Sequence, residues 1–275
     1  MTDLQRRVKT ALILLPLFVA AVLWLPSIWL AGLLGLVVLL GAWEWAHLCG
    51  LNEPMQRGAF VLATLVLLVG LGWGGLAATW SAALFWVALL WWAFALGAII
   101  WFQAGGELVW PRGGWALGLG WVIVIPPWLG IWALHQDPTF GPGWVLCLLC
   151  VVWVADIGAY FCGRRFGRRK LASRVSPGKT VEGIVGALLI GSVLAFVGIA
   201  TLGWQPLWLV LVVVLATVLM SVLGDLAESM MKRQAGVKDS GSLLPGHGGV
   251  LDRIDSLTAA VPFFVLCASA IRSAA

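Results

Sequence analysis

The sequence predicts an all-α, polytopic integral membrane protein with about nine transmembrane helices. The 275-residue chain has a mean hydropathy of +1.00, and only 11% of its residues are charged, against roughly 25% in soluble domains. Asp, Glu, Lys and Arg are absent from the stretches 10–43, 58–106 and 183–224. Each stretch exceeds the roughly 20 apolar residues that one membrane-crossing helix needs. Because lipid offers backbone amides no partner, these stretches must be helical.

Turn signals divide the apolar stretches into individual spans. The breaks are "LPS" at 25–27, "GWGG" at 72–75 and "GWQP" at 203–206. No small-residue cleavage site follows the first span, so we expect it to be retained instead of being removed as a signal peptide. The expected helices cover residues 10–25, 27–47, 58–77, 81–102, 114–134, 143–162, 181–202, 207–229 and 256–272.

The basic residues predict which side of the membrane the loops occupy. With nine spans, the loops 48–57, 103–113, 163–180 and 230–255 lie on the same side as the N-terminus. These segments hold most of the 17 basic residues, so the positive-inside rule places the N-terminus and these loops in the cytosol. We expect a multi-pass protein of the cell (inner) membrane whose active site faces the cytosol. Tryptophans near predicted helix ends, such as Trp24, Trp29 and Trp45, suit interfacial anchoring.

The chemistry-bearing residues gather in the second half of the chain. Of 17 basic residues 12 follow residue 150, as do 7 of 12 acids. We therefore divide the chain into an N-terminal transmembrane scaffold of about five helices (1–150) and a catalytic transmembrane region of about four (151–275). The net charge of +5, carried beside a membrane face, suggests anionic lipid or nucleotide partners and no nucleic acid.

Two acids fall inside predicted spans, where a charge is costly enough to indicate function. Asp156 lies in "VVWVADIGAYFCG" and Asp225 in "LMSVLGDLAESMMKR". Asp225, Glu228 and Lys232 share one helical face. Glu228 either forms a salt bridge with Lys232 or takes part in the site, and both alternatives stay open. For Asp225 we favour a metal or substrate role.

The segment "SPGKTVEG" at 176–183 predicts a phosphate contact. Ser176 is expected to cap, Pro177 and Gly178 to turn the chain, and Thr180 or Glu182 to begin the seventh helix. Lys179 then lies beside a helix N-terminus, which favours anions. A P-loop is excluded because position 173 is Ser and no parallel sheet is expected. The basic run just before it, residues 164–170, is either topogenic or functional.

A Gly-rich segment, "KDSGSLLPGHGGVLDRIDS" at 238–256, holds most of the remaining polar groups. Its glycines, including Gly248 and Gly249, let backbone amides approach an anion closely. Asp252 and Asp255 lie one turn apart and, with Asp225, provide oxygen ligands of the kind Mg²⁺ prefers. Further donors come from Lys238, His247 and Arg253. Such a site suits metal-assisted phosphoryl or nucleotidyl transfer on a lipid at the membrane surface.

Residues 229–255, "SMMKRQAGVKDSGSLLPGHGGVLDRID", resemble the signature of the phosphatidate cytidylyltransferases, or CDP-diacylglycerol synthases. The pattern is Ser-x-x-Lys-Arg, Lys-Asp, Pro-x-His-Gly-Gly and Asp-Arg-x-Asp. The segments 155–167 and 176–183 are similar to two further family segments. Before residue 155 the likeness is in hydropathy and in "EW" at 44–45. Ile157 and Gly178 depart from the usual Thr and Lys or Arg, and the second departure removes a cation beside Lys179.

The resemblance implies a reaction of CTP with phosphatidic acid that yields CDP-diacylglycerol and pyrophosphate. It implies Mg²⁺, with K⁺ in the same site in some members. Asp225 and Asp252 match the metal-ligand positions, with Asp255 close by. The other expected catalytic residues are Lys238, His247 and Arg253. The residues expected to bind substrate are Asp156, Ser176, Lys179, Thr180, Lys232, Arg233, Gly248 and Gly249.

Three other functions differ from this one in product, in motif or in the placement of charge. A CTP-dependent polyisoprenoid-alcohol kinase would release CDP instead of pyrophosphate. A CDP-alcohol phosphatidyltransferase needs Asp-x-x-Asp-Gly followed by Ala-Arg, and Ser256 follows Asp255 here. A transporter is disfavoured because the ionisable residues gather at one membrane face instead of at mid-bilayer. Whether the protein forms a homodimer stays open.

Overall fold

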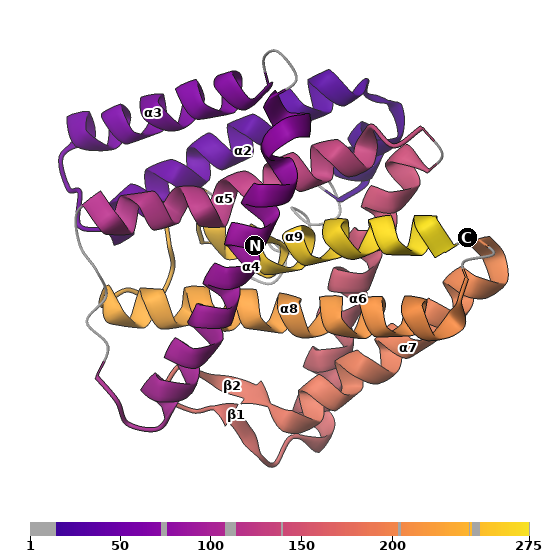
Figure 1. Ribbon diagram of the computed structural model, residues 1–275. Coiled ribbons are helices and arrows are strands. Elements are labelled where there is room, and N and C mark those ends of the chain that lie inside the picture. Colours follow the sequence, from indigo (N-terminus) through magenta and orange to yellow (C-terminus); the bar gives the residue numbers. More distant parts are fainter. Residues whose placement is uncertain are drawn as a thin grey trace.

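The computed structural model describes residues 15–72, 76–107, 114–138, 140–202, 205–241, 243 and 248–274 (Figure 1). Helices dominate this part of the chain, which confirms the all-α class. A ten-residue apolar helix, Leu15–Trp24, precedes the labelled elements. The labelled helices are α2 (Ser27–Leu48), α3 (Pro54–Gly72), α4 (Leu76–Gln103), α5 (Gly114–His135), α6 (Gly141–Phe166), α7 (Val181–Leu202), α8 (Leu207–Gln234) and α9 (Leu251–Ala274).

A helix occupies each of the nine predicted positions. Within the described residues, α2 to α8 contain segments long and apolar enough to cross a membrane. Several helices extend beyond the apolar stretch that predicted them: α6 ends at Phe166 and α8 at Gln234, because polar residues prolong a helix past the hydrocarbon. Helix α9 begins at Leu251, before the expected start at residue 256, so Asp252 and Asp255 lie within the helix. Positions 10–14 of the first predicted span lie outside the described residues.

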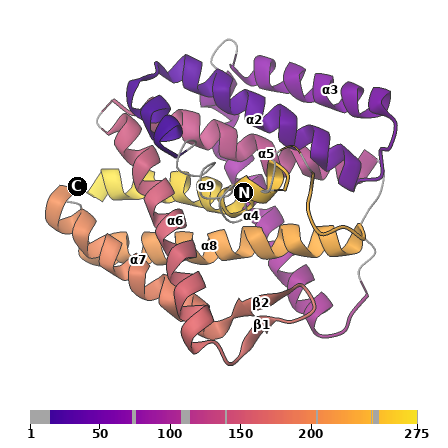
Figure 2. The same cartoon turned by 180° about the vertical axis from the view of Figure 1, so that it is seen from behind.

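Helix α9 occupies the centre of the molecule. It packs against α8, α5, α4, α6 and α2. Figure 1 shows α4 crossing it on one face, and Figure 2, from behind, shows α6 crossing the other. Ala259, Ala260, Val261 and Phe264 are almost fully buried there. This central position brings the polar start of α9 to where several helices meet.

A short antiparallel hairpin connects α6 to α7. Strand β1 (Lys170–Ala172) pairs with β2 (Ser176–Thr180). The prediction that Ser176 caps and that Pro177 and Gly178 turn the chain is wrong, because these residues lie within β2. Tertiary contacts set the turn at 173–175 instead, where Val175 is buried and Gln103 bonds the hairpin at positions 173 and 174.

The start of α7 agrees with the prediction. The helix begins at Val181, directly after β2. The Thr180 hydroxyl oxygen accepts a hydrogen bond of 3.2 Å from the Gly183 amide, the bond that an N-cap residue makes. Lys179 therefore lies beside a helix N-terminus, as expected from the sequence.

The ends of helices predicted to share one membrane side lie together. Arg174 in the hairpin donates to the Phe102 carbonyl at the end of α4 (2.6 Å) and stacks on its ring. Lys179, at the end of the same hairpin, reaches α8. These contacts agree with the predicted sidedness of the loops after α4 and α6.

Trp45 does not anchor at an interface. It is 2% exposed and donates to the Ala116 carbonyl of α5 (2.8 Å), whereas Trp24 and Trp29 are largely exposed, so interfacial anchoring stays a prediction for those two. A Cβ at Gly120 would collide with the Trp45 ring, so glycine lets α2 and α5 approach closely. Trp45 therefore packs the end of α2 against α5.

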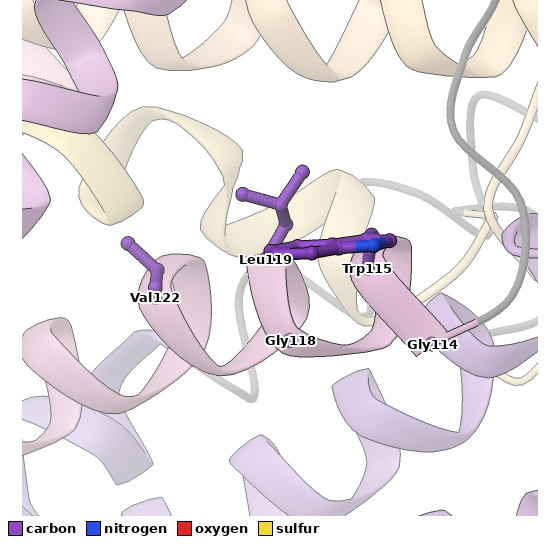
Figure 3. Close-up of a pocket in the computed structure, with 5 residues that line it drawn as sticks. All are labelled: Gly114, Trp115, Gly118, Leu119 and Val122. Atoms are coloured by element: carbon purple, nitrogen blue, oxygen red, sulfur yellow. The ribbon is translucent and has the colours of Figure 1, made fainter.

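A surface groove of about 520 Å³ lies along the first turns of α5 (Figure 3). Its lining consists of Gly114, Trp115, Gly118, Leu119 and Val122. Apart from the Trp115 indole, the figure shows apolar side chains and glycine backbone. Because these groups present no cation or carboxylate, the groove does not account for the phosphate chemistry predicted from the sequence.

Gly224 generates a prediction about the contact between α8 and α9. A Cβ at this position would collide with the Asp255 carbonyl oxygen. We expect Gly224→Ala to lower the thermal unfolding temperature in detergent, since overpacking costs about 1–3 kcal/mol and exceeds the gain of about 1 kcal/mol in helix propensity. Tryptophan fluorescence during heating measures the unfolding temperature.

Gly70→Ala in α3 is the matched control, because nothing lies within 4 Å of a Cβ there. This variant should unfold at the wild-type temperature or above it. An unfolding temperature for Gly224→Ala equal to that of Gly70→Ala would contradict the close contact.

Candidate active site

The predicted acids meet on α8 and α9, which run antiparallel (Figure 1). Asp225 lies one turn before Glu228 and two turns before Lys232 on α8. Asp252 and Asp255 lie in the first turns of α9. Gly224 touches the backbone of Asp255, and Lys232 contacts Asp252. The acids of both helices therefore lie along the interface between α8 and α9, which we call the acidic seam. The structure thus brings Asp225 and Asp252 to the same end of this helix pair.

Lys179 reaches this seam from strand β2. Its ammonium nitrogen is 2.6 Å from the Asp225 carboxylate, and both side chains are partly exposed. The Ser229 hydroxyl donates to the other Asp225 oxygen at 3.2 Å. The lysine expected to contact a phosphate therefore pairs with the carboxylate expected to bind the metal.

Lys232 forms the second lysine pair of the site. It contacts Glu228 at 3.1 Å and also pairs with Asp252. All three side chains are at most 10% exposed. Of the two alternatives left open for Glu228, the salt bridge with Lys232 is present in the structure. Because Lys232 is buried between two protein carboxylates, the structure gives it no open path to a substrate phosphate.

Asp252 holds the glycine-rich segment in place. Its second oxygen accepts hydrogen bonds from the amides of Ser240 (2.9 Å) and Gly249 (2.8 Å) and from the Ser240 hydroxyl (3.1 Å). Gly248 has a φ of +81°, which favours glycine, and a Cβ there would lie 2.7 Å from Asp252. The anion that the Gly249 amide approaches is thus a carboxylate of the protein itself.

Asp225 is the shared neighbour of two further acids. Its carboxylate lies close enough to repel the carboxylates of Asp156 in α6 and of Asp255 in α9. One Asp255 oxygen accepts from the Ser256 amide at 2.7 Å. Together with Glu228 and Asp252, five carboxylates gather around Lys179 and Lys232. When all are ionised, these seven groups carry an excess of negative charge, which attracts a cation.

The donor set suits Mg²⁺ only if the substrate completes it. No group of three or more Asp, Glu, His or Cys side chains in the described residues is arranged to hold a metal. Mg²⁺ ordinarily binds through one or two carboxylates, several waters and substrate phosphates. Asp225 fits that role best, because its carboxylate is partly exposed and lies in the acidic cluster. Asp252 fits less directly, since Lys232 and two amides already surround its oxygens.

The remaining predicted residues differ in exposure and in the element that holds them. Arg233, Lys238 and Arg253 have exposed side chains at the end of α8, in the following segment and at the start of α9. Ser176 is half-buried in β2, and Thr180 is buried as the cap of α7. His247 lies outside the described residues.

Sequence reasoning missed Glu44 as a member of this site. Glu44 lies in α2, is 3% exposed and accepts hydrogen bonds from Ser240, Val250 and Leu251. A signal was present in the sequence, because Glu44 is the first charged residue after a long apolar stretch. Its partner could not be inferred from that signal.

Comparison with known proteins identifies the family. A family model described as "Cytidylyltransferase family" matches residues 5–271. The chain belongs to the cytidylyltransferase family. A phosphatidate cytidylyltransferase of Pseudomonas aeruginosa is 44% identical over 268 residues, which cover 95% of each chain.

Two further relatives of this cytidylyltransferase family member carry the same name. The Haemophilus influenzae protein is 39% identical over 95% of this chain and 97% of its own length. The Bacillus subtilis protein is 45% identical over 126 residues, which cover 45% of this chain and 46% of its own length. The first two relatives match from end to end, so the likeness includes the N-terminal helices.

The buried Lys232 pair generates a stability prediction. Lys232→Met leaves Glu228 and Asp252 without their ammonium partner. Removing one member of a buried ion pair costs about 3–5 kcal/mol, so we expect a marked fall in the unfolding temperature. Arg233→Met, at the next and exposed position, should change stability by no more than about 0.5 kcal/mol. Equal unfolding temperatures for the two variants would show that the Lys232 ion pairs do not stabilise the protein.

Proposed function

We propose that this protein transfers the cytidylyl group of CTP to phosphatidate. An oxygen of the phosphatidate phosphate bonds to the α-phosphorus of CTP, the bond between that phosphorus and the bridging oxygen breaks, and pyrophosphate leaves. The product is CDP-diacylglycerol. The observation that carries the proposal is the likeness to two phosphatidate cytidylyltransferases over 95% of the chain.

The acidic seam supports the same chemistry. CTP and phosphatidate are both anionic, so their reaction needs cations to neutralise the phosphate oxygens and to align them. Mg²⁺ held by Asp225 and Asp252 would neutralise the triphosphate and polarise its α-phosphorus. The family resemblance implies that K⁺ can occupy the same site.

The protein's own cations have separate tasks. Lys179, partly exposed at the edge of the seam, is positioned to contact a phosphate when it leaves Asp225. Arg233, Lys238 and Arg253 provide exposed positive charge at the end of α8, in the following segment and at the start of α9. Lys232 instead holds Asp252 and Glu228 in place. Binding and orienting the phosphates is thus the task of residues from β2, α8, α9 and the segment before α9.

The location of the seam also suits a lipid substrate. Asp225 belongs to an apolar helix that is long enough to cross a membrane, and it lies near the polar end of that helix. A headgroup at the bilayer surface would meet the carboxylates there while its acyl chains remain in lipid. We infer from the basic loops that this surface is the cytosolic face of the cell (inner) membrane.

The metal assignment predicts loss of turnover when the carboxylates are neutralised. We expect Asp225→Asn and Asp252→Asn to insert into the membrane but to lose Mg²⁺-dependent formation of CDP-diacylglycerol. Glu53→Gln, which neutralises an exposed acid between α2 and α3, is the control and should keep wild-type activity. Wild-type turnover by purified, folded Asp225→Asn would overturn the assignment of that ligand.

Lys179→Ala tests the phosphate contact. A charged hydrogen bond contributes about 1.5–3 kcal/mol, so KM for CTP or for phosphatidate should rise by at least about tenfold. Lys170→Ala, the other lysine of the hairpin, should leave both KM values unchanged. Steady-state assays with each substrate varied in turn measure the effect, and unchanged KM values in Lys179→Ala would remove Lys179 from the substrate site.

A product assay separates the proposal from its nearest rival. Purified protein is supplied with CTP labelled in the cytidine, phosphatidate and Mg²⁺. Cytidylyl transfer puts the label into the lipid fraction and releases pyrophosphate. Release of CDP with an unlabelled lipid fraction, in the presence of a polyisoprenoid alcohol, would instead identify a lipid kinase.

A further inference from the structure

Glu44 is a buried acid in an otherwise apolar helix. It is 3% exposed, and the preceding 34 residues contain no Asp, Glu, Lys or Arg. Burying a carboxylate is costly unless hydrogen bonds compensate for the lost water. The compensation comes from residues about 200 positions later in the chain, within the glycine-rich segment and the start of α9.

Both carboxylate oxygens of Glu44 accept hydrogen bonds at the N-terminus of α9. One accepts from the Val250 amide at 2.8 Å, and the other from the Leu251 amide at 3.0 Å. The first amides of a helix have no partner within the helix, and the helix dipole makes this end positive. Glu44 therefore acts as an N-terminal cap that α2 supplies to α9.

The same carboxylate is linked to Asp252 through one hydroxyl. Ser240 donates to Glu44 at 2.8 Å and lies within 3.1 Å of Asp252, whose oxygen also accepts from the Ser240 amide. A Cβ at Gly241 or Gly249 would lie within contact distance of the Glu44 carboxylate. These two glycines thus allow the chain to fold closely around Glu44.

We propose that Glu44 is a positioning residue for the cytidylyltransferase reaction, an inference that rests on the proposed function. By fixing the first turn of α9, it sets the location of the Asp252 carboxylate and, one turn later, of Asp255. Within the part of the chain that the structure describes, the ion pairs of Lys179 and Lys232 are made with Asp225, Glu228 and Asp252, and Glu44 takes part in none of them. Its effect on the reaction therefore passes through α9.

Glu44→Gln is the direct test. Glutamine keeps the size of the side chain but replaces one acceptor oxygen with an NH₂ group that faces a donor. Loss of a residue that supports a ligand typically costs about 10- to 100-fold, and we expect kcat to fall by that factor. KM for CTP should change less than about threefold, in contrast to Lys179→Ala. Thr217→Val, which removes a fully buried hydroxyl from α8, is the control and should keep wild-type kcat.

Hydrogen exchange tests whether Glu44 caps α9, independently of catalytic activity. The amides of Val250 and Leu251 should exchange at least about tenfold faster in Glu44→Gln than in wild type or Thr217→Val. Ser240→Ala cuts the link to Asp252 while it keeps Glu44, so it should lower kcat with less effect on these two amides. If Glu44→Gln fails to accumulate in the membrane, the kcat of Ser240→Ala tests the positioning role instead.

The outcomes separate this inference from the proposed function. Wild-type kcat and unchanged exchange in Glu44→Gln, or wild-type kcat in Ser240→Ala, would overturn the positioning role. If wild-type protein makes no CDP-diacylglycerol, the proposed function fails and the catalytic part of this inference fails with it. Faster exchange in Glu44→Gln would still establish the capping role of Glu44 in that case.

Discussion

The structure depends on the pairing of charges that the membrane-spanning helices bury. An unpaired ion in a region of low dielectric constant is expensive, and a partner must be close and well oriented to offset that cost. Lys232 lies between Glu228 and Asp252, Lys179 contacts Asp225, and Glu44 receives amides from α9. The same groups determine how α2, α8, α9 and the hairpin pack, so binding chemistry and helix packing use one set of contacts.

The helical part of the fold was predictable because its signal is local. A helix must satisfy its own amides in lipid, so long apolar stretches identify helices whatever they contact. The hairpin was harder: Pro177 and Gly178 suggested a turn, but the burial of Val175 and the bonds from Gln103 place the turn earlier. Likewise Trp45, near a helix end, faces α5 instead of the interface. Both errors arise from contacts between segments far apart in the sequence.

The sequence indicated which types of residue gather at the candidate site, but it did not indicate which residues each of them contacts. The spacing of Glu228 and Lys232 on one helical face allowed their pairing, which the structure shows, whereas Asp225 pairs with Lys179 from the hairpin. The glycines at 248 and 249 indicated a close approach to an anion, which occurs, but Asp252 and Glu44 are the anions that the structure brings there. No local pattern states which helices meet at that segment.

The central location of α9 has a consequence for the order in which the protein is built. A ribosome delivers α2 before α9, and Glu44 is separated from its amide partners by 206 and 207 positions. During insertion the Glu44 carboxylate therefore lacks these partners until the start of α9 has emerged. Contacts of such long sequence separation form slowly. The acidic seam is thus assembled only after α9 has been synthesised, and chains released before α9 lack it.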